Sequence, residues 1–166
     1  MDKILTEAIE RTEKEAIPGK VDWSGSPFLR VKDLGKNAVG GFGENLYATI
    51  QESLGNSAQV VRAEHDVLVS TSGGFKKVEV KTAFQSKSKS FFFNQIRLNH
   101  DKTEAPKDWD TLAFIFVEPH KIEVWEIDRA NLNAREEFKW NNGWSWNRRS
   151  SQLLSSTWRK IYDGAA

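Results

Sequence analysis

The segment from residue 64 to residue 81 constrains the fold most, because two runs that alternate apolar and polar residues flank Ser72-Gly73-Gly74. Such a pattern predicts a β-hairpin. A short loop at the glycines places Asp66 directly opposite Glu79, with their Cβ atoms about 5 Å apart. Side chains alternate along a strand, so Glu79 and Lys81 project to the same side. The hairpin is therefore predicted to carry two carboxylates and an ammonium on one face.

Two carboxylates at this separation repel each other unless a cation lies between them or one of them holds a proton. Carboxylate oxygens suit Mg²⁺, which keeps several waters and shares its shell with phosphate. A neighbouring lysine can orient or deprotonate the attacking water, so these groups fit metal-assisted phosphodiester hydrolysis. An exposed hairpin with cross-strand salt bridges fits the same spacing equally well.

Length and composition narrow the class of protein. The chain has 166 residues, a formal net charge of +1 and no cysteine. We expect one domain spanning residues 1–166. The lack of cysteine excludes disulfides and thiolate metal sites and fits a cytoplasmic protein. No apolar run approaches the roughly 20 residues of a membrane span, and the first residues do not read as a signal peptide.

Two helices are predicted in the first third of the chain. The first, residues 2–16, is either a dimerisation helix or a lid on the core. The second covers residues 38–54, and its glycine-rich start at 40–43 would let another backbone or a phosphate approach the helix N–H groups. Glu44 follows these glycines. It either complements the helix dipole or is a third acidic group aimed at the hairpin.

The strands after the hairpin define the fold class. Residues 111–117 form a nearly continuous apolar run, typical of a central strand, and residues 122–127 read as its partner. Residues 91–97 read as a further core strand or a short buried turn. We predict an α/β (α+β) fold with a mixed central sheet of about five strands flanked by helices.

Residues 131–166 are rich in tryptophan and arginine. Arginine recognises guanine edges, asparagine recognises adenine, and basic side chains contact phosphates, so this segment fits duplex DNA. Alternatively the tryptophans pack on the sheet while their polar neighbours form a solvated rim, and we expect both. The predicted DNA-binding residues are Lys87, Lys89, Arg97, Asn141, Asn142, Asn147, Arg148 and Arg149.

The order of acidic residues resembles a known family. Glu44 on a helix, then Asp66, then Glu79-Val80-Lys81 on the next strand resembles the PD-(D/E)xK nuclease superfamily. Residues 93–97, 108–110 and 117–120 also resemble small bacterial restriction-endonuclease-like proteins. His65 stands where the superfamily pattern has proline. The resemblance implies a restriction-endonuclease-like core at about residues 38–127.

The resemblance also implies roles for the matching residues. Asp66 and Glu79 would bind Mg²⁺, for which Mn²⁺ substitutes, and the backbone carbonyl of Val80 would join them. Lys81 would orient or activate the attacking water. Glu44 would act through water or a second metal. Gln95 would lie near the metal or the scissile phosphate, although a glutamine capping the end of a strand is an equal alternative.

The function implied is a Mg²⁺-dependent endonuclease acting on double-stranded DNA, most like a type II restriction endonuclease. Such a subunit would cut both strands as a homodimer, because duplex sites with two-fold symmetry suit two-fold symmetric proteins. The alternatives are a structure-selective repair nuclease such as a junction resolvase or nicking enzyme, a non-catalytic DNA-binding module of the same fold, and an RNA-directed nuclease.

Overall fold

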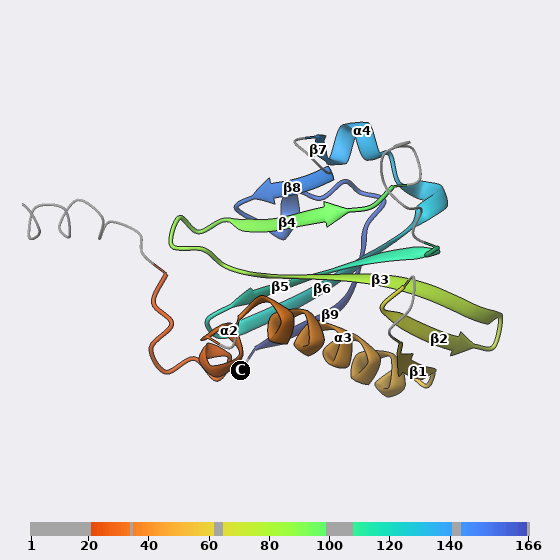
Figure 1. Cartoon of the computed structure of the whole chain (residues 1–166), viewed down its shortest axis with the longest axis horizontal. Coiled ribbons are helices and arrows are strands. Elements are labelled where there is room, and N and C mark those ends of the chain that lie inside the picture. The colour runs from red at the N-terminus through yellow and green to blue at the C-terminus, as the bar shows by residue number, and fades with distance from the viewer. Residues whose placement is uncertain (1–20, 34, 62–64, 99–107, 141–143, 166) are drawn as a thin grey trace, which may run out of the picture.

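The computed structural model describes residues 21–33, 35–61, 65–98, 108–140 and 144–165 (Figure 1). The predicted helix at 2–16 lies outside these residues. The helices are α2 (Leu29–Asp33), α3 (Lys36–Ser53) and α4 (Ala134–Glu137), with short 3₁₀ turns at Arg129–Asn131 and Ser151–Leu153. The strands are β1 (Ser57–Val60), β2 (Val67–Thr71), β3 (Gly74–Phe84), β4 (Phe91–Ile96), β5 (Thr111–Glu118), β6 (Lys121–Asp128), β7 (Lys139–Trp140), β8 (Trp144–Arg148) and β9 (Arg159–Ala165).

The central sheet is mixed, with the strand order β1-β2-β3-β5-β6-β9. Only β3 and β5 pair in parallel, and the other neighbours are antiparallel. The predicted central strand is confirmed, because β5 lies between β3 and β6 and is buried from Thr111 to Val117. The sheet has six strands rather than about five, since the C-terminal segment adds β9 along β6.

One face of the central sheet is covered by α3 (Figure 1). The helix begins at Lys36 rather than at residue 38, so the glycines lie inside it. Their N–H groups are therefore not the unpaired groups of a helix start, and the prediction that they could receive a phosphate is wrong. Gly43 serves packing instead. A Cβ there would lie 1.8 Å from Thr82 Oγ1 on β3, so only glycine lets helix and strand approach this closely.

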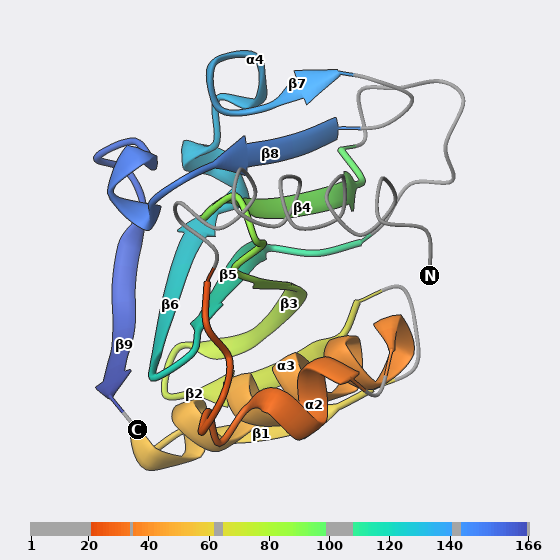
Figure 2. The ribbon, with the colours of Figure 1, turned by 90° about the vertical axis from the view of Figure 1, so that its left-hand side faces the viewer.

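A second sheet covers the opposite face. It has the order β4-β8-β7 and rises above β3 and β5 (Figures 1 and 2). Phe91 and Phe93 of β4 and Trp146 of β8 point inward, and the Phe93 ring stacks on Phe114 with centroids 4.0 Å apart. Residues 91–97 were predicted as a core strand or a short buried turn, and β4 is a strand outside the central sheet. It pairs instead with the tryptophan-rich tail, because the alternating aromatic residues of the tail supply a second apolar face.

Three tryptophans of the tail, Trp144, Trp146 and Trp158, are part of this core, as expected. Trp146 is 1% exposed and Trp158 5% exposed, and Trp144 packs at the edge of the same cluster. No helix in the described ranges combines the length and the apolar character needed to cross a bilayer.

Candidate active site

The hairpin formed by β2 and β3 has the predicted register. A two-residue turn joins the strands, and the ladder ends with Val67 opposite Val78. Asp66 directly precedes β2, so one further step places it opposite Glu79. The backbone N–H of Asp66 donates to the carbonyl of Val78 at 3.0 Å, which holds Asp66 in line with the ladder.

The Asp66 carboxylate turns toward β3. Its Oδ2 accepts a hydrogen bond from the backbone N–H of Val80 at 2.8 Å. In a β-strand the N–H and C=O of one residue point to the same edge. The carbonyl of Val80 therefore points to the side of β3 on which Asp66 lies. The Val80 carbonyl therefore has the direction that it needs to bind the same metal ion as Asp66.

Glu79 and Lys81 form an ion pair on β3. Glu79 is fully buried, and the Lys81 Nζ lies 2.7 Å from its Oε1, while 21% of the Lys81 side chain is exposed. Their cross-strand partners Leu112 and Phe114 belong to the core beneath the small sheet, so both side chains face that sheet. The ammonium thus stabilises a buried carboxylate and also reaches toward solvent.

The oxygen atoms of Asp66, Glu79 and the Val80 carbonyl suit a hard divalent cation. Two carboxylates and an adjacent carbonyl edge offer oxygen ligands, the type that Mg²⁺ prefers, and Mg²⁺ fills its remaining positions with water and phosphate. Within the described ranges, no three histidine, aspartate or glutamate side chains gather into one metal-binding group. The site therefore rests on the pair Asp66 and Glu79.

Glu44 lies on α3 and is partly buried. It follows Gly43, which touches Thr82, and Thr82 shares the α3-facing side of β3 with Val78 and Val80. Glu79 and Lys81 alternate to the opposite side. The helix thus approaches β3 from the face that does not carry this ion pair, and a role for Glu44 in metal binding stays a prediction.

Gln95 is exposed near the end of β4 and has a φ of +52°. Its conformation coincides with a register shift between Phe93 and Ile96 in the pairing of β4 with β8. A bulge re-aims side chains, and a positive φ at a residue other than glycine often accompanies functional positions. The strain agrees with a functional role for Gln95, which remains a prediction.

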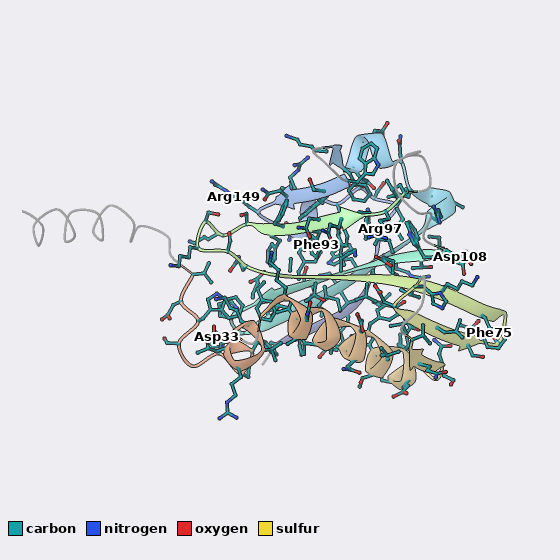
Figure 3. The ribbon with its side chains drawn as sticks, in the orientation of Figure 1. Asp33, Phe75, Phe93, Arg97, Asp108 and Arg149 are labelled. Atoms are coloured by element: carbon teal, nitrogen blue, oxygen red, sulfur yellow. The ribbon has the colours of Figure 1, made fainter. Side chains whose placement is uncertain are left out.

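Among the described residues, those predicted to bind DNA lie on the small sheet or beside it. Lys87 and Lys89 are exposed in the turn before β4, and Arg97 and Arg149 lie at opposite ends of the sheet (Figure 3). Arg148 departs from the expectation that it faces outward. It is paired with the inward-facing Phe91, is partly buried, and donates from Nη1 to the Asn147 carbonyl at 3.0 Å. Asn147 is exposed, and Asn141 and Asn142 lie outside the described residues.

A second group of charged residues lies on the α3 side of the sheet. The buried Glu126 of β6 accepts from Tyr47 Oη at 2.7 Å and from Lys76 Nζ at 3.3 Å, and it also pairs with Arg159. Burial, followed by the charge of Glu126, raises the pKa of Tyr47. A pocket of about 420 Å³ opens beside this group, and Lys160 is among its lining residues. Asp66, Glu79 and Lys81 do not line it.

Two features escaped the sequence reasoning. One is the Glu126 group, whose members lie on four elements and give no local motif. The other is Phe92, which is 52% exposed on β4 between the buried Phe91 and Phe93. The sequence alone could have predicted this exposure, because a strand of three consecutive phenylalanines with one buried face must turn the middle ring outward.

Comparison with known proteins shows which solved structure this fold resembles. No protein-family model matches the chain, and no curated protein matches it. Among solved structures it is similar to the bacterial homing endonuclease I-Ssp6803I. The TM-score is 0.50 at 12% identity, over 74% of this chain and 81% of that one. The chain has a restriction-endonuclease-like fold, as predicted. Within this fold, the predicted residues Asp66, Glu79 and Lys81 meet at the β2–β3 hairpin.

Proposed function

We propose that the chain is a divalent-metal-dependent endonuclease that hydrolyses phosphodiester bonds of double-stranded DNA. The observation that supports this most is the cluster at the hairpin: Asp66 against the backbone of Val80, and Glu79 paired with Lys81. The cluster occurs in a restriction-endonuclease-like fold, and the similar solved structure is a bacterial homing endonuclease.

The residues of the hairpin would have different roles in catalysis. Asp66 and Glu79 would hold Mg²⁺, or Mn²⁺ in its place, together with the Val80 carbonyl. When bound, the ion would supply Lewis-acid stabilisation of charge on the phosphate and favour ionisation of water. Lys81 lies beside Glu79 with its ammonium partly open to solvent, so it can donate a hydrogen bond that orients the attacking water or a phosphate oxygen. Glu44 and Gln95 would assist from the edges of this site.

In finer detail, we propose a type II restriction endonuclease that acts as a homodimer and cuts both strands of a symmetric site. The basic residues around the small sheet would contact phosphates. A structure-selective repair nuclease and a non-catalytic DNA-binding module are the competing proposals. The retention of Asp66, Glu79 and Lys81 in one hairpin favours catalysis over the binding module.

The test is incubation of the purified chain with supercoiled plasmid and unmethylated genomic DNA, once in millimolar Mg²⁺ and once in EDTA. Discrete fragments that require Mg²⁺ support a sequence-specific endonuclease. Nicking confined to junction substrates favours the repair nuclease. Duplex binding without cleavage in Mg²⁺ and in Mn²⁺ contradicts the proposed activity. Sedimentation with and without DNA measures the proposed dimer.

A further inference from the structure

The outer face of the small sheet presents an aromatic ring beside an amide. Phe92 of β4 and Asn147 of β8 are directly paired across the two antiparallel strands. Their neighbours Phe93 and Trp146 are buried against the central sheet, whereas Phe92 is 52% exposed and Asn147 is also exposed. Directly paired residues have Cβ atoms about 5 Å apart, so the ring and the amide form one contiguous surface.

This face has the charge of a surface that binds a polyanion. The segments 85–98 and 144–150 contain five basic residues and no aspartate or glutamate. Four of these basic side chains flank the Phe92–Asn147 pair from the turn before β4 and from the ends of β4 and β8. They are Lys87, Lys89, Arg97 and Arg149. The arrangement is complementary to the phosphates on the two sides of a groove in nucleic acid.

The position of Phe92 is not explained by packing. The core of this layer is already filled by Phe91 and Phe93, whose rings contact Phe116 and Phe114. Recognition surfaces are enriched in aromatic residues and arginine, and the outer face combines both types. β4 lies over β3, the strand that carries Glu79 and Lys81, so this outer face and the candidate active site are on opposite sides of the small sheet (Figures 1 and 2).

We propose that the outer face of β4 and β8 enters the major groove of duplex DNA, and that Phe92 and Asn147 together recognise one A·T base pair. The asparagine amide would make two hydrogen bonds to adenine N6 and N7. The phenylalanine ring would pack against the C5-methyl group of the paired thymine. The major groove of B-DNA admits a two-stranded β-ribbon, and these are the contacts by which an amide and an apolar side chain distinguish A·T from G·C.

This inference rests on the proposed function, since it names bases that the endonuclease would recognise. The experiment begins with the full chain in EDTA, where cleavage does not occur, and selects bound duplexes from a random pool. The selected site is then remade with each thymine replaced by deoxyuridine, which removes only the C5-methyl group. Binding is measured for the wild type and for Phe92→Ala, Phe92→Leu and Asn147→Ala. Phe75→Ala is the matched control, because Phe75 is 75% exposed at the tip of the β2–β3 hairpin, away from the small sheet (Figure 3).

We expect one thymine at which the wild type and Phe75→Ala bind deoxyuridine several-fold more weakly. Phe92→Ala should bind both duplexes alike, and Phe92→Leu should keep part of the preference. In Asn147→Ala, the ratio of the affinity for A·T to the affinity for G·C at the same base pair should fall roughly 5- to 100-fold. Melting temperatures near wild type would show that the variants fold, as their exposed positions lead us to expect.

Unchanged base preferences in both Phe92→Ala and Asn147→Ala would overturn the inference. So would a loss of affinity that is equal on every duplex, because it would assign the two residues to phosphate or general contact. If the wild type still cleaves discrete sites in Mg²⁺ in that case, the proposed function stands and this inference alone fails. If the wild type neither selects nor cleaves duplex DNA, the proposed function fails first.

Discussion

Two groups of charged residues, each around one buried glutamate, lie at the same sheet and differ in composition. The hairpin site contains two carboxylates, Asp66 and Glu79, and one ammonium, Lys81. The β6 group contains one carboxylate, Glu126, which accepts from a phenol, an ammonium and a guanidinium. In the β6 group the cations outnumber the carboxylate. In the hairpin a second carboxylate lies opposite the first.

The comparison shows that a buried ion pair does not by itself indicate a catalytic site. Glu126 is as well buried as many catalytic carboxylates and lies beside the pocket of about 420 Å³, yet its partners neutralise it and fix α3 to β6 and β9. A metal site needs carboxylates that converge, because their mutual repulsion is relieved when a cation binds. That property belongs to the hairpin, and the following experiments separate the two groups.

The largest difference is expected in cleavage. Glu79→Gln preserves the size of the side chain and removes the negative charge of a proposed metal ligand, so Mg²⁺-dependent cleavage should fall by about 10³-fold or more. Glu126→Gln removes a carboxylate of similar burial from the β6 group and should leave cleavage within a few-fold of wild type. The measurement is the single-turnover rate on one duplex site.

The free energy of unfolding in urea should be measured for the same two variants. Glu126→Gln leaves Lys76 and Arg159 without their carboxylate and should cost about 1–3 kcal/mol of stability. Glu79→Gln removes repulsion with Asp66 and should cost less in EDTA. Equal losses of activity in the two variants would remove the distinction between a catalytic and a structural carboxylate.

The next largest effect concerns acid stability on β6. Burial alone would raise the pKa of Glu123, but hydrogen bonds from Lys121, Ser151, Trp125 and Lys160 together lower its pKa from 4.5 to about 2. Since the folded-state pKa is the lower one, this stabilisation is present above pH 4.5 and is lost as the pH falls toward 2.

Glu123→Gln should therefore flatten the dependence of unfolding free energy on pH between 4.5 and 2. By the same linkage it should remove up to about 3 kcal/mol at pH 7. Urea titrations across this pH range measure the effect. A variant that follows the wild-type profile would show that Glu123 is not the titrating group.

Metal binding should give an effect of intermediate size, confined to the hairpin. With a dissociation constant near 1 mM, 10 mM Mg²⁺ stabilises the folded chain by about 1.4 kcal/mol. Asp66→Asn keeps an oxygen that can accept the Val80 N–H and removes the charge, so it should abolish the stabilisation. Glu126→Gln should keep it. Melting at matched ionic strength tests this, and an undiminished Mg²⁺ effect in Asp66→Asn would exclude Asp66 as a ligand.

Local sequence patterns were enough to predict the hairpin and its register, from alternation, and the buried β5, from a continuous apolar run. The register followed because a two-residue turn fixes the pairing, and Asp66 opposite Glu79 is a direct consequence. The second sheet was not foreseen. Whether Phe91 and Phe93 join the central sheet or pair with the distant Trp146 depends on contacts between segments far apart in the chain.

The same distinction holds for the sites. Glu79 and Lys81 are close in sequence, so period-2 alternation placed them together. Tyr47, Lys76 and Glu126 come from α3, β3 and β6, and only the packing of α3 on the sheet unites them. The glycines of α3 were misassigned, because a glycine that permits close helix packing looks in sequence like one that opens a phosphate-binding turn.

The smallest effect is expected at the rim of the small sheet. Arg149 is exposed, so Arg149→Ala should weaken binding to all duplexes and lower the slope of log affinity against log salt by about one. Arg148 donates to the backbone of Asn147 and is partly buried, so Arg148→Ala should change that slope less. Binding isotherms at several salt concentrations compare the two. Equal slopes in both variants and the wild type would place this end of the sheet away from the phosphates.

The most direct test is to locate the metal. Crystals of the full chain grown with Mn²⁺ should show one anomalous peak at the hairpin, within about 2.3 Å of a carboxylate oxygen of Asp66 and of one from Glu79. The same crystals should show no peak beside Glu126. A Mn²⁺ ion bound elsewhere, in a preparation that cleaves DNA with Mn²⁺, would contradict the assignment of the hairpin as the active site.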